Sequence, residues 1–175
     1  ERLVGFARGL IHGEDEAAAV ARGRLLSVLV GHFEESATIA AVELLHDFNP
    51  DHLLRLGSDE RPLVRSLLAA HFSTSELPEE RAILLAFLED DDPRVEAAAV
   101  ASLGHIRLEG ARTELLLRAR FAEGIVRQAA LEACGRLGGE GVQGALVVGL
   151  AEREQSYQLS SLRGLAHLGD PEQIS

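Results

Sequence analysis

The stretch EDDDPRVEAAAVASLGHI, from Glu89 to Ile106, decides how this chain is interpreted. It opens with four consecutive acidic residues, which are either a carboxylate site for a metal ion or the turn between two helices. A proline follows where a helix would begin, and alanine, valine and leucine then recur at helical spacing. The choice depends on whether the stretch recurs elsewhere in the chain.

The stretch does recur, because the chain aligns with itself without gaps at a shift of 31 residues from about residue 28 onward. The blocks are 28–58, 59–89, 90–120, 121–151 and the incomplete 152–175. One column stays apolar or aromatic in every block: Phe33, Val64, Val95, Val126 and Tyr157. Such columns are typical of stacked helix pairs that share one core. We predict an all-α, right-handed α-α superhelix of helical hairpins with about 31 residues per repeat.

Other columns assign roles within each hairpin. Pro62 and Pro93 share a column at the start of the first helix, where the missing N–H of proline costs nothing. Gly104, Gly135, Gly138 and Gly139 fall near the ends of first helices, where a left-handed residue often terminates a helix. In the second half of each block two adjacent columns are apolar and are predicted to face the core: Leu53, Leu84, Leu115 and Leu146, then Leu54, Leu85, Leu116 and Val147.

We expect residues 1–175 to form a single solenoid domain. Residues 1–27 do not align cleanly and are predicted to form two further helices, as an irregular repeat or a cap that covers the end of the array. The chain lacks an initiator methionine and opens on ERLVGFARGL, already helical in pattern. We therefore interpret it as an excerpt of a longer protein.

The composition restricts the classes of partner. The chain has 17 basic residues, all arginine, against 28 acidic residues, so its net charge is −11. This charge disfavours nucleic acid and anionic lipid, since phosphate binding relies on basic side chains. The longest uncharged stretch, GVQGALVVGLA, has 11 residues, too few for a membrane span. The single cysteine, Cys134, shares an apolar column, predicting a buried small hydrophobe in a reducing, cytoplasmic setting.

The segments DDPRVEAAAVASLGHI and EGIVRQAALEACGRLG resemble HEAT repeats, and in particular the short bacterial repeats of phycobilisome lyase type. The resemblance covers about 145 residues and rests on a pattern of Asp, Val-Arg, alanines and a late glycine. We expect the matching residues to have structural roles: Asp92, Pro93, Val95, Gly104, Val126, Arg127 and Gly135.

The resemblance implies a non-catalytic scaffold or regulatory module that binds a protein partner. Two alternatives belong to other classes. A bilin-lyase-like subunit would handle a tetrapyrrole, and a HEAT-like DNA glycosylase would need a basic groove and aromatic residues, which an acidic chain without tryptophan disfavours. The family also implies that Arg65 and Arg127 pair with acids of a neighbouring turn, for which Asp59, Asp90 and Asp92 are candidates.

In this register Glu89–Asp92 spans the turn between two repeats. An Asp before Pro93 can accept hydrogen bonds from the free N–H groups of the next helix and favours its positive end. The run lacks the alternating oxygens and glycine of a calcium loop. We therefore predict a turn and a helix cap, and no catalytic, metal or cofactor site.

The second helices usually line the concave side of such an array, and their outward residues are the candidates for partner binding. Charged residues border a possible apolar stripe there, as at a protein interface. The alternative is that these residues only pack against adjacent second helices, which a stack requires. The candidates are Ile83, Phe87, Glu114, Leu117, Arg118, Phe121 and Val148.

Overall fold

The computed structural model describes residues 50–169, and every regular element in this part of the chain is helical. The predicted helix pair in residues 1–27 and most of block 28–58 lie outside the described residues. The longer helices are α4 (Pro50–Leu56), α5 (Pro62–His71), α6 (Pro78–Ala86), α7 (Pro93–His105), α8 (Arg112–Phe121), α9 (Gly124–Leu137), α10 (Val142–Ala151) and α11 (Gln155–Leu168). Short 3₁₀ turns are η1 (Phe72–Thr74), η2 (Phe87–Glu89) and η3 (Glu109–Ala111). The predicted all-α class is confirmed.

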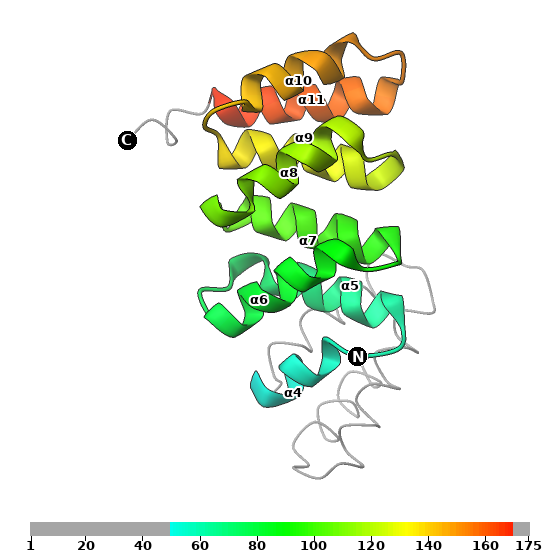
Figure 1. Cartoon of the computed structure of the whole chain (residues 1–175), viewed down its shortest axis with the longest axis vertical. Helices are drawn as coiled ribbons and strands as arrows, with labels where there is room; N and C mark the ends of the chain where they lie inside the picture. Colours follow the sequence, from blue (N-terminus) through cyan, green and yellow to red (C-terminus); the bar gives the residue numbers. More distant parts are fainter. Residues whose placement is uncertain (1–49, 170–175) are drawn as a thin grey trace, which may run out of the picture.

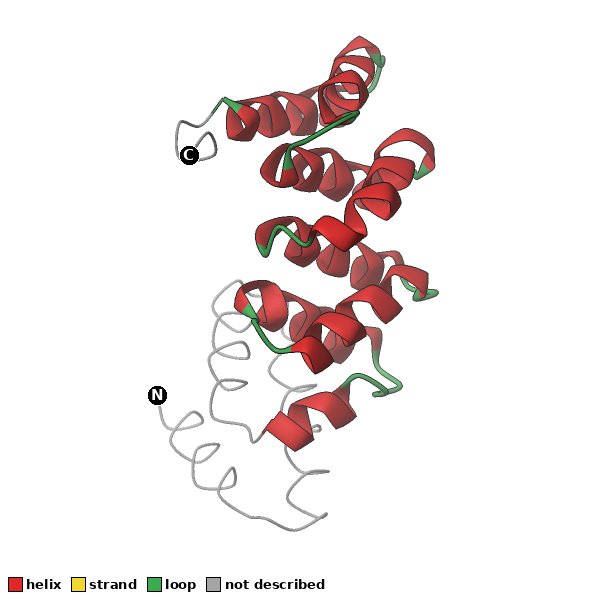
Figure 2. Ribbon diagram, turned by 60° about the vertical axis from the view of Figure 1, so that its left-hand side comes forward, coloured by secondary structure: helices red, strands yellow, loops and turns green. Residues whose placement is uncertain are grey.

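The helices form two layers. The first helices α5, α7, α9 and α11 begin at residues 62, 93, 124 and 155, at intervals of 31 residues, and each packs beside the next. The second helices α6, α8 and α10 each cover a first helix, and α8 also contacts α10. Figures 1 and 2 show the resulting stack of hairpins, consistent with a solenoid of helix pairs.

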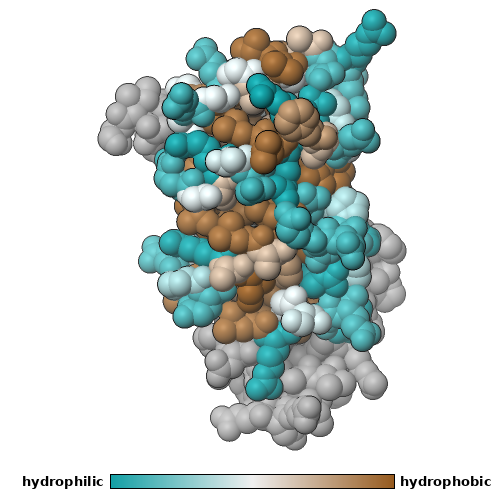
Figure 3. Space-filling model, viewed as in Figure 1, coloured by the Kyte–Doolittle hydropathy of each residue, from teal (hydrophilic) through white to brown (hydrophobic). Residues whose placement is uncertain are grey.

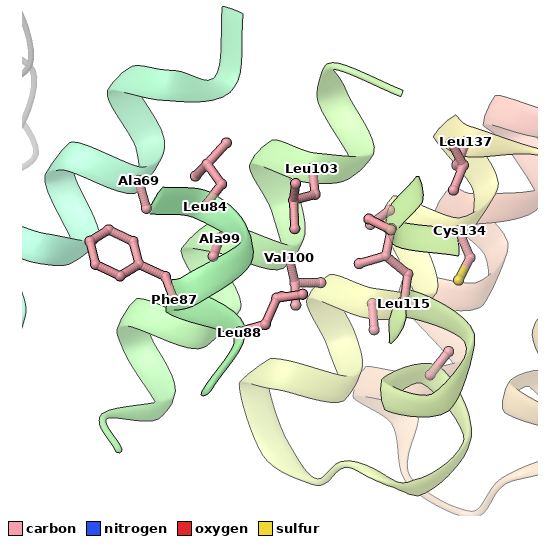
Figure 4. Close-up of a cluster of buried hydrophobic side chains, with 14 of the residues drawn as sticks. Ala69, Leu84, Phe87, Leu88, Ala99, Val100, Leu103, Leu115, Cys134 and Leu137 are labelled. Atoms are coloured by element: carbon pink, nitrogen blue, oxygen red, sulfur yellow. The ribbon is translucent and has the colours of Figure 1, made fainter. Parts of the chain in front are cut away.

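The core runs through the whole described stack between the two layers. Val64, Val95, Val126 and Tyr157 are each at most 7% exposed, so this column is buried in every described repeat. The column of Leu53, Leu84, Leu115 and Leu146 on the second helices is equally buried and belongs to the same hydrophobic cluster as Val95 and Tyr157. Figure 4 shows Leu84 and Leu115 of this column among other core side chains. Each fully buried leucine contributes about 1.5–3 kcal/mol.

The prediction that the neighbouring column faces the core is wrong for Leu85 and Val147, whereas Leu116 does pack against the core. Leu85 and Val147 are 40% and 54% exposed, and Leu116 is only partly buried. A helix that packs mainly against one layer below buries a narrow stripe, so the adjacent position faces sideways. These side chains are covered only where another second helix lies beside them.

Gly104 and Gly135 are not helix ends, which corrects the sequence-based prediction. Both are buried inside helices α7 and α9, and both lie where one first helix crosses the next. A Cβ on Gly104 would lie 2.5 Å from the Cβ of Ala133, and a Cβ on Gly135 would collide with the backbone of Gly164. Their role is to let consecutive first helices approach closely.

The prediction of left-handed glycines at a helix end is confirmed for Gly138 and Gly139. Gly138 and Gly139 have φ of 69° and 89° and end α9, with the Gly138 amide donating to the Cys134 carbonyl. A side chain is strained at such φ values, so glycine is favoured there. Within residues 50–169, no helix combines the length and the apolar character needed to cross a membrane.

Gly135→Ala is predicted to lower the free energy of unfolding by about 2–3 kcal/mol, because the added methyl group meets backbone that cannot move aside. Gly144→Ala is the matched control, since α10 leaves open space at that position. It should raise stability by about 0.5–1 kcal/mol through the lower backbone entropy of alanine. Urea unfolding followed by circular dichroism measures both. Equal effects of the two variants would contradict the close-approach role.

Candidate functional site

The carboxylate of Asp90 is held by an arginine of the preceding repeat. Arg65 donates to it through Nε and Nη2, at 2.7 and 2.8 Å, and the two side chains are only 16% and 9% exposed. The Asp92 amide also donates to Asp90 Oδ1. The Arg65 guanidinium is the main reason that the pKa of Asp90 lies below its ordinary value.

Asp92 is the N-cap of α7. Its Oδ1 accepts from the Arg94 amide at 2.9 Å, and the Arg94 guanidinium binds the same carboxylate. The pKa of Asp92 is lowered to about 2, chiefly by the hydrogen bond from the Arg94 side chain and then by the hydrogen bond from the Arg94 amide. Both carboxylates are therefore committed to arginine and to the helix end, as a turn and cap require. Residues 50–169 contain no cluster of three His, Cys, Asp or Glu placed to hold a metal ion.

Ion pairs between hairpins recur along the stack. Arg127 Nη2 donates to Glu152 Oε1 at 2.8 Å, and this pair joins two residues 25 apart, as the Arg65–Asp90 pair does. The arginines also satisfy carbonyls near the ends of second helices: Arg65 donates to Asp59 O and Arg127 to Ala119 O. We refer to these contacts as the inter-hairpin ion pairs. Both arginine side chains are largely buried, at 16% and 12% exposure, so the geometry of these contacts is restricted.

The middle repeat lacks this pair. Glu96 stands in the arginine column and Phe121 in the acidic column, so the usual pair cannot form. Arg118 of α8 replaces it, donating to Glu96, Glu114 and Glu89 and to the Leu88 carbonyl. Its side chain is only 12% exposed. Arg118 is thus a structural residue with its donors occupied, which corrects its assignment to the partner-binding face.

The other candidate residues of the second helices separate into three groups. Phe87 is 5% exposed and belongs to the core, so its assignment to an accessible face was wrong. Ile83 is partly buried and lies against Gly57 beside α4, as lateral packing between second helices would place it. Leu117, Phe121 and Val148 are 46%, 71% and 48% exposed, so these three are accessible.

A groove of about 220 Å³ opens between α8 and α10 beside Leu117. We call it the α8–α10 groove, and it is lined by Thr113, Leu116, Leu117, Arg120, Gly141 and Ala145. Figure 3 shows apolar side chains gathered across the middle of this view of the molecule, among hydrophilic neighbours. The prediction had missed Arg120 and Leu116. The spacing of Thr113, Leu116 and Arg120 along α8 could have identified that flank.

The groove differs in charge from the rest of the chain. Helix α10 contains no charged residue between Val142 and Ala151, and Arg120 is the only charged side chain among the lining residues. Arg120 is exposed and makes no ion pair within residues 50–169. An acidic protein therefore presents here an apolar floor with one available guanidinium, which suits an apolar group next to a carboxylate.

Comparison with known proteins agrees with this architecture. Residues 50–135 match the family model for HEAT repeats. This match supports a HEAT-repeat family. The chain also resembles the crystal structure of an engineered protein, with a TM-score of 0.57 at 18% identity, over 99% of this chain and 84% of that one. At that identity the likeness shows the fold alone. A search of curated proteins finds no match. The phycobilisome-lyase type of HEAT repeat, and with it the handling of a bilin, stays a prediction.

Acid is predicted to weaken the array through the Arg65–Asp90 pair. Because the pKa of Asp90 is lower in the folded chain than the ordinary value of about 3.9, the pair contributes fully above that pH. Its contribution is lost as the pH falls below about 4 towards the folded pKa. Asp90→Asn should lower the free energy of unfolding by about 1.5–3 kcal/mol at pH 7. Between pH 6 and pH 3 the variant should lose less stability than the wild type, because it no longer has this carboxylate to protonate.

Asp91→Asn is the matched control, because Asp91 is exposed and makes no ion pair within residues 50–169. It should follow the wild type at every pH in urea unfolding. If Asp90→Asn and Asp91→Asn behave alike, the pair does not stabilise the array.

Cys134 is buried at 1% exposure, which confirms the predicted core position, and burial raises the pKa of its thiol to about 12. The thiol therefore stays protonated at neutral pH and is a poor nucleophile. Ellman's reagent is expected to leave the native chain unlabelled and to react with one thiol per chain in guanidinium. Rapid labelling of the native chain would place Cys134 outside the core.

Proposed function

We propose that the chain is a non-catalytic protein-interaction scaffold or regulatory module, which binds a partner on the face formed by the second helices. The α8–α10 groove carries this proposal, because it joins accessible apolar side chains to an uncharged helix. Leu117 forms one wall, and Val148 is exposed on the neighbouring helix α10. Hydrophobic side chains that stay exposed beside a concavity are typical of protein interfaces.

The groove supports a partner segment of defined chemistry. Its volume of about 220 Å³ accommodates one or two side chains rather than a whole domain. Arg120 would bind a carboxylate next to the inserted apolar group, since guanidinium and carboxylate form two parallel hydrogen bonds. We therefore propose a short segment with an apolar anchor and an adjacent Asp or Glu.

The buried surroundings of α8 favour binding without rearrangement. Arg118 ties α8 to Glu96 of α7 and to the carbonyl of Leu88, so the helix that carries Leu117 and Arg120 is held on its inner side. A surface that is already ordered loses little entropy when a partner binds. The unpaired thiol of Cys134 supports a reducing compartment, and we propose a cytoplasmic location for the module.

Selection of 12-residue peptides from a random display library tests this proposal. We expect selected peptides to combine an apolar residue with a nearby Asp or Glu. Leu117→Asp should weaken their binding at least tenfold by placing a charge in the groove. Arg120→Gln should weaken acidic peptides more than their amide counterparts, because only the carboxylate loses its charged partner.

Leu77→Asp supplies the control, since Leu77 is 47% exposed, like Leu117, but lies outside the groove at the start of α6. Binding by fluorescence anisotropy should be unchanged in this variant. The melting temperature of each variant is measured in parallel with its binding. Peptides that bind Leu117→Asp and the wild type equally would show that the groove is not the binding site.

A further inference from the structure

The walls of the α8–α10 groove restrict the backbone conformation of a segment that can lie in it. Both walls are α-helices, whose backbone N–H and C=O groups bond within each helix except near its ends. Neither wall offers a strand edge, so an extended segment could not add itself to a sheet there. Its backbone groups would face apolar side chains without hydrogen-bond partners, which costs free energy.

A proline-rich segment is also a poor fit to the groove. Grooves that bind the polyproline II conformation are lined by aromatic rings. None of the described residues that line the α8–α10 groove is aromatic. An α-helix satisfies its own backbone groups, so it can lie on this apolar surface without losing backbone hydrogen bonds.

The outer face of α10 allows another helix to approach closely. Gly141, Gly144, Ala145 and Val148 follow one another at helical spacing, so they share one face of the helix and its N-terminal boundary. A Cβ added at Gly144 would contact nothing within 4 Å, so this face is unobstructed there. Small residues of this kind let two helix axes come within about 8–10 Å of each other.

The length of the groove sets the spacing of the side chains that enter it. On α8, Thr113 and Arg120 mark the two ends of the lining. They lie seven residues apart, and at about 1.5 Å per residue this distance is about 10 Å, or two turns of a helix. The volume of about 220 Å³ admits one or two side chains. Two apolar side chains that are three or four residues apart on a bound helix match this length.

The position of Arg120 favours one direction for the bound helix. Helices α8 and α10 run in the same direction (Figure 1), and Arg120 lies in the last turn of α8. The last turn of a helix carries a partial negative charge and the first turn a partial positive charge. A helix antiparallel to α8 places its positive N-terminal end beside Arg120. The carboxylate that Arg120 binds then belongs to the first turn of the bound helix, where acidic residues are also favoured.

We propose that the α8–α10 groove binds an amphipathic α-helix that runs antiparallel to α8. Its Asp or Glu lies in the first turn, and two apolar residues follow on the same face, about four and seven residues later. This inference rests on the proposed function, in which the groove is the partner site, and adds the conformation, the direction and the residue order of the partner segment.

Three synthetic peptides of about 16 residues, built on alanine and glutamine, test the helix and its direction. The forward peptide has glutamate at position 4 and leucines at positions 8 and 11, and the second peptide is the same sequence reversed. The third is the forward peptide with proline at position 6, on the opposite face, where proline breaks the helix. By fluorescence anisotropy, we expect the forward peptide to bind at least fivefold more tightly than the reversed one and at least tenfold more tightly than the proline one.

A variant of the chain tests the close approach to α10. Gly144→Gln should weaken binding of the forward peptide at least fivefold, because its side chain occupies the space in which the bound helix lies. The melting temperature should not fall, since the position is open in the free chain. Leu77→Asp is the control and should leave binding of this peptide unchanged.

Equal affinities of the forward and reversed peptides overturn the antiparallel direction, and equal affinities of the forward and proline peptides overturn the helix. If the three designed peptides fail to bind but peptides selected by display bind in a way that depends on Leu117, this inference is overturned and the proposed function stands. If no peptide binds in a way that depends on Leu117, the proposed function is overturned as well.

Discussion

The close approach of consecutive first helices is the constraint on which the rest of the structure depends. It is possible because the crossing points carry residues with almost no side chain: Gly104 meets Ala133, and Gly135 meets Gly164. At this separation the valine and leucine columns of adjacent hairpins reach one another and exclude water. A larger residue at a crossing would separate the helices along their length, and would therefore weaken many contacts together.

The inter-hairpin ion pairs restrict the orientation of each hairpin relative to the next. An apolar stack alone tolerates small rotations of one hairpin against the next, whereas forked arginine–carboxylate pairs are satisfied in a narrow range of geometries. Arg65 forms such a forked pair with Asp90, whereas Arg127 and Arg118 each combine one hydrogen bond to Glu152 or Glu96 with a hydrogen bond to a backbone carbonyl. The replacement of the usual pair in the middle repeat also leaves Phe121 in an acidic column, where it is 71% exposed at the end of α8. One local change in the pairing thus explains both a buried arginine and an exposed aromatic residue.

The proposed partner-binding surface arises from positions that the repeat buries only where a neighbouring second helix covers them. The α8–α10 groove lies where two second helices contact each other along only part of their flanks, and Leu117 stays accessible. Because the second helices contact one another less than the first helices do, apolar side chains such as Leu117 and Val148 stay accessible on them.

The sequence by itself determined the helical hairpin, its 31-residue spacing, the cap at Asp92 and the buried column that includes Val95. These features are set by local capping chemistry and by the spacing of apolar residues, both of which are visible in one dimension. Only the tertiary structure decided that Phe87 is buried, that Leu85 and Leu117 are exposed, and that Arg118 serves the stack. It also decided that Gly104 and Gly135 are crossing points rather than helix ends. Periodicity shows which residues share a face of a helix, but the coverage of that face depends on how near the neighbouring helix lies, and that distance is a property of the packed stack.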